Sequence, residues 1–218
     1  MKKQELNKEI LMEKYSDYLL SKGKRPVNVY VFAKENNFTE TKFYEYFPSF
    51  EAIEQSYLVY FFDKSLNLVK QIEGFETMPA KEQLLNLYYI FFENLNLNRS
   101  LVLTLLTEDW RKSFDVLRQL RNAHQNFVKG TNFEDGKLFE EASERLKKIG
   151  DKSREELLWL HFLSVLDFWK KDTSPSFEKT DLYIEKSIDT GFEIVQNPLI
   201  DKFIDLGKFL WKEKFQMS

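Results

Sequence analysis

Apolar residues recur at three- and four-residue intervals along most of this chain, which is the spacing of amphipathic helices. The first such stripe includes Leu6, Ile10 and Leu19. It predicts a helix over residues 4–22, which Gly23 ends. Sustained alternation of apolar and polar residues, which would indicate half-buried strands, does not occur. The pattern therefore predicts an all-α protein.

Two short helices are predicted next, each opened by a residue whose side chain can cap a helix. Asn28 opens the first, over residues 28–36, and Thr39 opens the second, which runs to about Tyr46. Between them, Asn37 tolerates the left-handed backbone that a tight turn needs. Two short helices joined by a tight turn, after a longer helix, have the geometry of a helix-turn-helix.

Ser49 then caps a long helix predicted over residues 50–73, and a break follows from Gly74 to Pro79. Further along, Ser174 followed by Pro175 is a capping residue with proline at the first helical position, which predicts a helix start. The remaining helices are predicted over residues 80–97, 99–107, 109–129, 135–149, 153–171, 175–192 and 198–215.

The helices divide into a predicted head, residues 1–48, and a larger helical body, residues 49–218. The formal net charge is −3 for the whole chain, but residues 1–47 carry +2 and the remainder carries −5. A mildly basic head on an acidic body is a weak indication that the head binds an anion such as DNA.

Composition excludes several classes of function. The 218 residues include no cysteine and two histidines, His124 and His161, so thiolate metal sites, disulfides and cysteine nucleophiles are excluded. A phosphate-binding glycine loop is absent from the sequence, and we expect no enzyme activity, no cofactor and no metal site. No apolar run is long enough to span a membrane, and the charged N-terminus lacks the apolar middle of a signal peptide. We therefore expect a soluble, cytoplasmic protein without membrane insertion.

The predicted helix-turn-helix carries a family resemblance. The stretch from Ala33 to Ser49 is AKENNFTETKFYEYFPS, and it resembles the head of the TetR family of bacterial regulators over about residues 8–60. Members of that family typically run A-x-x-A-G-V-S-x-G-x-[FL]-Y-x-[HY]-F. The resemblance implies a TetR-like fold with a three-helix DNA-binding head and a helical ligand-binding and dimerisation body. It also implies a one-component transcriptional regulator that binds double-stranded operator DNA as a homodimer.

Hydroxyl, amide and cationic side chains gather around the second short helix, where they can donate to phosphate oxygens or reach base edges. By resemblance, Tyr44 contacts the DNA backbone, and Thr41, Lys42 and Tyr46 lie where the family reads DNA. The predicted DNA-binding residues are Lys24, Arg25, Asn28, Thr39, Thr41, Lys42, Tyr44 and Tyr46.

Four residues depart from the family pattern. Glu40 and Glu45 place acidic groups on the recognition helix, Phe50 replaces a phosphate-binding lysine, and Asn37 replaces the turn glycine. Each acidic residue that faces phosphates lowers DNA affinity. The alternative function is therefore a TetR-fold protein that binds a lipid or small molecule and has lost operator binding.

A fainter resemblance concerns residues 168–180, FWKKDTSPSFEKT. This stretch is similar to a segment of the TetR-like lipid-binding accessory protein of ubiquinone biosynthesis. Helix capping by Asp172 or Ser174, with Pro175 at the first position, accounts for most of the same letters.

Two surfaces are predicted in the body. Aromatic residues make up 16% of the chain, and they can line a pocket for a small apolar ligand, although aromatic stripes on helices are usually core. The last helices are apolar on more than one face, which favours a twofold dimer contact. The predicted pocket residues are Tyr88, Phe92, Trp110, Phe127, Trp159, Phe162 and Trp169; the predicted dimer residues are Ile188, Phe192, Phe203, Leu210 and Trp211.

Overall fold

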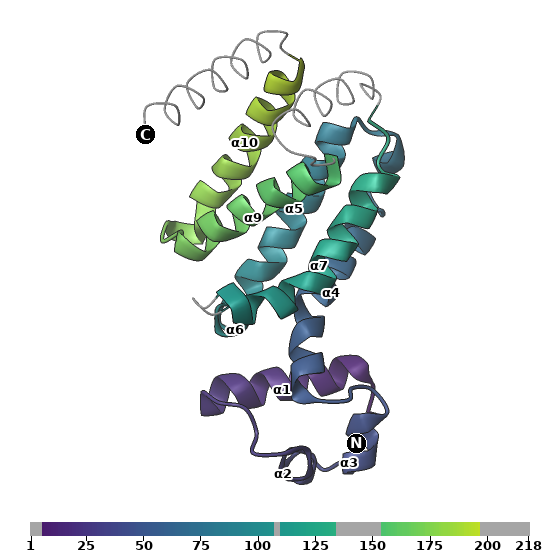
Figure 1. The fold of residues 1–218 in the computed structure, drawn as a ribbon, viewed down its shortest axis with the longest axis vertical. Coiled ribbons are helices and arrows are strands. Elements are labelled where there is room, and N and C mark those ends of the chain that lie inside the picture. The colour runs from purple at the N-terminus through teal and green to yellow at the C-terminus, as the bar shows by residue number, and fades with distance from the viewer. Residues whose placement is uncertain (1–5, 107–109, 134–153, 197–218) are drawn as a thin grey trace, which may run out of the picture. The chain divides into compact units, whose positions relative to one another are not determined.

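The structure is a computed structural model that describes residues 6–106, 110–133 and 154–196. Regular structure within these ranges is entirely helical, as the apolar spacing predicts (Figure 1). The elements are α1 (Lys8–Lys22), α2 (Val29–Glu35), α3 (Glu40–Tyr44), α4 (Phe50–Val69), η1 (Phe75–Thr77), α5 (Ala80–Leu97), α6 (Arg99–Leu105), α7 (Trp110–Gly130), α9 (Arg154–Lys171), η2 (Pro175–Phe177) and α10 (Glu178–Gln196). The predicted helices over 135–149 and 198–215 lie outside the described residues.

The capping residues identified in the sequence begin the helices as predicted. The side-chain oxygens of Asn28, Thr39 and Ser49 each accept a hydrogen bond from the backbone N–H three residues later, at 2.9, 3.4 and 3.3 Å. Gly23 ends α1 in the left-handed conformation (φ 66°), and its N–H donates to the carbonyl of Leu19 at 2.9 Å. These ends depend on neighbours within four residues, which is why the sequence predicts them.

Three predicted helix ends are wrong, and one of them is residue 192, because α10 continues to Gln196. The first helix begins at Lys8 rather than residue 4, because the Asn7 side chain caps it by accepting from the N–H of Ile10 at 2.9 Å. The long helix α4 ends at Val69 rather than residue 73. There the backbone tightens, and the N–H of Ile72 donates to the carbonyl three residues back instead of four.

The predicted helix start at Pro175 also needs correction. Pro175 opens the short 3-10 turn η2, and the α-helix α10 begins only at Glu178. In between, Ser176 (φ 52°) and Phe177 (φ 59°) are both left-handed, a conformation that interrupts a right-handed helix.

Asp172 explains why the helix starts where it does. Its carboxylate accepts hydrogen bonds from the N–H and hydroxyl of Ser174 at 2.8 and 2.7 Å. It also accepts from the N–H and hydroxyl of Thr180 at 2.9 and 2.7 Å. One carboxylate thus caps both sides of the η2 turn, and the capping role expected for Asp172 is confirmed.

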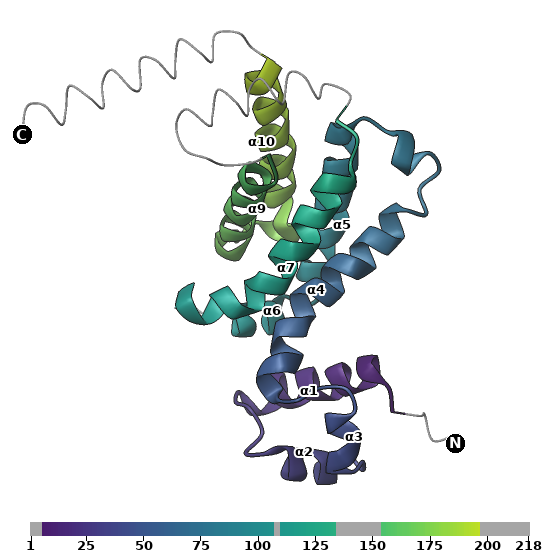
Figure 2. The same ribbon diagram turned by 45° about the vertical axis from the view of Figure 1, so that its right-hand side comes forward.

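The packing divides the chain into two compact units. The first contains α1–α3, α4 up to Ser65 and residues 93–123; within it α1 contacts α6, and α2 contacts α3. The second contains residues 66–92, the end of α7 from His124, and α9 and α10, which run side by side (Figures 1 and 2).

The cap of α3 gives a first testable prediction. Replacing Thr39 by alanine removes the side-chain acceptor at the start of this five-residue helix. It should lower the free energy of unfolding by about 1 kcal/mol, as measured by urea denaturation. The matched control is Thr41→Ala, on the exposed face of the same helix, which should change stability by less than about 0.5 kcal/mol. Equal effects of the two variants would contradict the capping role.

Candidate nucleic-acid interface

The helices α2 and α3 are joined by a turn of the kind that a helix-turn-helix needs. Asn37 takes a left-handed conformation (φ 59°), and the N–H of Phe38 donates to the carbonyl of Ala33 at 3.0 Å. The buried rings of Phe32 on α2 and Phe43 on α3 meet edge to face at 6.3 Å. Both rings also meet Phe50, the first residue of α4, at 5.8 and 5.3 Å, so both helices turn an apolar face toward the start of α4.

The outer face of α3 carries the residues expected to read DNA. Thr41, Lys42 and Tyr44 are all exposed. However, the Lys42 ammonium forms an ion pair with Glu45 at 2.7 Å, and the Tyr44 hydroxyl donates to the Glu40 carboxylate at 3.4 Å. The two acidic residues that depart from the family pattern thus contact the cation and the hydroxyl that would meet phosphate.

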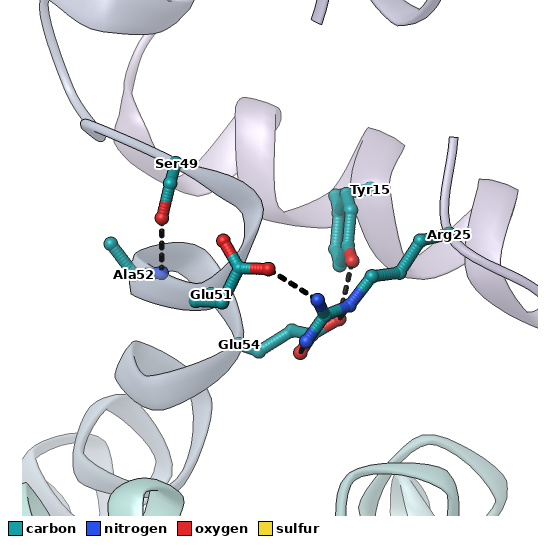
Figure 3. Close-up of polar contacts among 6 residues, drawn as sticks. All are labelled: Tyr15, Arg25, Ser49, Glu51, Ala52 and Glu54. Atoms are coloured by element: carbon teal, nitrogen blue, oxygen red, sulfur yellow. Dashed lines mark hydrogen bonds and ion pairs between the residues drawn. The ribbon is translucent and has the colours of Figure 1, made fainter. Parts of the chain in front are cut away.

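Arg25, expected to contact phosphate, lies instead against α4 (Figure 3). Its guanidinium forms a two-pronged ion pair with Glu54, with Nε 2.8 Å from Oε1, and a further ion pair with Glu51. The Tyr15 hydroxyl donates to the same Glu54 carboxylate. Hydrogen bonding to Glu54 raises the pKa of Arg25, so its charge is present at every working pH. Sequence reasoning missed this cluster because the residues that bond to one another in it are 26 to 39 positions apart.

Three of the other predicted DNA-binding residues form hydrogen bonds within the protein, and the fourth is exposed. Asn28 and Thr39 use their side chains as helix caps. The Tyr46 hydroxyl donates to the carbonyl of Leu6 at 2.9 Å, which joins the segment after α3 to the segment before α1. Lys24 is exposed in the loop between α1 and α2.

In the second unit, several predicted pocket residues pack into one aromatic cluster. The Phe162 ring lies at the centre, with ring centroids 5.1 Å from Tyr88, 5.7 Å from Phe92 and 5.5 Å from Trp159. Trp169 reaches Phe92 at 6.5 Å. All five side chains are buried, so the structure brings them together as core residues around α5 and α9.

Two histidines join this cluster as its polar members. The Tyr88 hydroxyl lies 2.8 Å from Nε2 of His124, and the His161 ring stacks on Tyr88 at 5.8 Å. On its other side His161 places Nε2 2.8 Å from the hydroxyl of Ser187 on α10. Burial lowers the pKa of His124 to about 3, with a further lowering by His161, and burial lowers the pKa of His161 to about 4. Both rings are therefore neutral at physiological pH.

The rest of the predicted body residues are more scattered. Phe127 is half-buried on α7, and Trp110 begins that helix, with its side chain outside the described residues. Ile188 is 3% exposed and belongs to the core of its own unit, while Phe192 is half-buried and stacks on Phe133 at 6.4 Å. The predicted dimer residues Phe203, Leu210 and Trp211 lie outside the described residues.

A hollow of about 490 Å³ opens at the corner where α9 meets α10. Phe168 and Tyr183 line it as a parallel stacked pair with centroids 4.5 Å apart, and Lys171 and Lys179 contribute cations. None of the predicted pocket residues lines this hollow. Within the described ranges, His, Cys, Asp and Glu side chains do not form a group of three that could hold a metal ion.

Comparison with known families decides the identity of the fold. A profile of the tetracyclin repressor-like C-terminal domain matches residues 83–210, more than half of the chain. The chain belongs to the TetR family. Searches of curated proteins and of solved structures gave no significant match.

The all-α TetR-like fold predicted from the sequence is thereby confirmed. The match falls on the body, whereas the main sequence resemblance, over about residues 8–60, concerned the head, so these two observations are independent. This TetR-family protein is a regulator in the general sense of its family, whose members are generally not enzymes. Among the described helices, none combines the length and apolar character needed to cross a membrane.

Proposed function

We propose that this TetR-family protein binds operator DNA through α3 of its head, and that a small apolar ligand in the body modulates the binding. The observation that carries the proposal is the paired, capped helices α2 and α3. They meet at the left-handed Asn37 and leave Thr41, Lys42 and Tyr44 exposed. Residues at the start of a recognition helix are those that reach base edges and phosphates in the major groove.

The operator would be palindromic. A homodimer places two recognition helices in successive major grooves, about 34 Å apart, so its half-sites are separated by one helical turn. Ligand binding would favour a dimer conformation with a different head spacing, and it can shift DNA affinity by no more than its own preference for that conformation. In the body, the hollow of about 490 Å³ beside α9 and α10, where Phe168 and Tyr183 stack, supports a ligand with an apolar face.

The acidic partners on α3 set the expected strength of binding. Glu45 holds Lys42, and Glu40 accepts from Tyr44, so the face offers DNA less positive charge than its sequence suggests. Glu45→Gln should therefore raise operator affinity about fivefold, equivalent to about 1 kcal/mol, and Lys42→Ala should lower it by a similar factor. Fluorescence anisotropy at several salt concentrations measures both changes.

The operator itself comes from selection of genomic fragments on the purified protein at low salt. An enriched palindromic fragment, bound with an affinity that falls steeply as the salt concentration rises, would establish that the protein is a DNA-binding regulator. The control variant is Lys64→Ala, which removes an exposed lysine of α4 away from α3 and should leave the affinity unchanged.

The same acidic contacts favour a second candidate function. Arg25, Lys42 and Tyr44 each contact a carboxylate within the first unit, which is expected of a TetR-fold binding protein that no longer needs DNA. In that case selection yields no enriched fragment, even with a Glu40→Gln, Glu45→Gln double variant. Mass spectrometry of an organic extract of the purified protein would then identify a bound lipid or other small molecule.

A further inference from the structure

Arg25 lies where three parts of the first unit meet: α1, the loop after it, and the first two turns of α4 (Figure 3). Glu54 on α4 accepts from both Nε and a terminal nitrogen of Arg25, and also from the hydroxyl of Tyr15 on α1. The Glu54 side chain is 11% exposed, whereas that of Glu51, the second partner of Arg25, is 57% exposed. The central carboxylate is therefore largely buried and satisfied by two different elements.

Aromatic ring contacts also connect α1, α2, α3 and the start of α4 around Tyr15. The Tyr15 ring stacks on Phe50, the first residue of α4, with centroids 5.3 Å apart. Its edge meets Phe32 of α2 at 5.9 Å. Phe50 in turn meets Phe43 of α3 at 5.3 Å. Tyr15 thus contacts the helix-turn-helix through its ring and α4 through both its ring and its hydroxyl.

A buried carboxylate cannot lose its partners cheaply, because it would be left without water and without hydrogen bonds. Turning α4 against α1 would separate Glu54 from Tyr15 and Arg25 together. Arg25 suits this role because its planar guanidinium binds a carboxylate at two points, which fixes direction as well as distance.

We propose that Arg25 is a positioning residue. Its ion pair with Glu54 makes the first two turns of α4 move with α2 and α3 as one rigid body. Arg25 then supports the recognition helix without contacting phosphate. The effect on operator affinity rests on the proposed DNA-binding function, whereas the rigidity of α2, α3 and the start of α4 does not depend on it.

The operator experiment compares two variants that remove the same negative charge. Glu45→Gln on α3 should raise affinity about fivefold, as electrostatics requires. Glu54→Gln should instead lower affinity, by about tenfold, because it loosens the support of α3. An increase with Glu54→Gln would overturn the positioning role.

The salt dependence separates positioning from phosphate contact at Arg25 itself. Loss of a phosphate contact reduces the slope of log affinity against log salt by about 0.9. For Arg25→Gln we expect weaker binding with the wild-type slope. A reduced slope would show that Arg25 contacts phosphate and would overturn the proposal.

Amide hydrogen exchange of the full chain tests the rigid body without DNA. Glu54→Gln should increase exchange at least tenfold across α2 and α3, while α9 and α10 in the other unit keep wild-type rates. Arg25→Lys, which keeps the charge and loses two-point binding, should give a smaller increase in the same helices. The charge-swapped Arg25→Glu, Glu54→Arg chain should partly restore protection.

Unchanged exchange in α2 and α3 for both single variants would overturn the proposal. If the wild-type protein binds no DNA at all, the proposed function fails, and the exchange result alone decides the rigid body. If Glu54→Gln unfolds the whole first unit, the milder Arg25→Lys variant carries the test, and wild-type exchange there would count against the proposal.

Discussion

Lowering the pH from about 7.5 to about 5.5 should reduce the free energy of unfolding by about 3 kcal/mol. The reason is the pair of buried histidines beside Tyr88. Burial lowers the pKa of His124 to about 3 and that of His161 to about 4, from an ordinary value of 6.5. Over this interval the unfolded chain takes up protons on both rings while the folded chain does not. The stability that the two neutral histidines contribute is therefore fully present above their ordinary pKa of 6.5, and it is lost as the pH falls below that value.

Urea denaturation at a series of pH values measures the effect. The interval lies above the ordinary pKa range of carboxyl groups, so their titration contributes little to it. His161→Gln removes one of the two titrating rings and can keep a hydrogen bond to Ser187, and it should halve the pH dependence. A flat profile between the two pH values would mean that the histidines titrate normally in the folded protein, which would contradict their neutral burial.

Replacing Asp172 by alanine should lower the free energy of unfolding by about 2–4 kcal/mol at neutral pH. The change removes the acceptor for four hydrogen bonds, from the N–H and hydroxyl groups of Ser174 and Thr180. Ser174 is 8% exposed and Thr180 is 1% exposed, so water cannot replace the lost partner fully. Asp172→Asn keeps one acceptor oxygen and should cost about half as much.

Asp167→Ala is the matched control, because it removes an aspartate five residues earlier, near the end of α9. Asp167 forms an exposed ion pair with Lys171 at 2.6 Å, which should contribute less than about 0.5 kcal/mol. Equal costs at positions 167 and 172 would contradict the capping role of Asp172. Burial raises the pKa of Asp172, but the hydrogen bonds lower it more, to about 2. Its contribution should therefore be lost at lower pH than that of the histidines, between about pH 4 and about pH 2.

The histidine pair and Asp172 differ in how much of their structure could be predicted from the sequence. A capping role for Asp172 could be predicted from the sequence, because the residues it caps are only two and eight positions further along the chain. They did not predict that α10 begins at Glu178 rather than Pro175. That outcome depends on the left-handed turn at Ser176 and Phe177, which no propensity favours.

The sequence by itself determined the parts of the protein that depend on neighbouring residues. Apolar spacing gave the helical class and placed α5 over residues 80–97, as observed. The caps at Asn28, Thr39 and Ser49 follow from side chains that reach three residues ahead. The pattern around Phe43 and Tyr44 was sufficient for the TetR resemblance, and the match over residues 83–210 confirmed the family.

Only the tertiary structure decided which partners the charged and polar side chains have. Arg25, exposed in a basic loop, was expected to contact phosphate, yet Glu54 lies 29 residues away and contacts it because α4 returns past α1. In the same way, Tyr88, His124 and His161 come from three helices and meet only in the folded core. Helix formation is governed by nearby residues, whereas the charge that a surface presents depends on long-range pairing, which a single sequence does not encode in any local pattern.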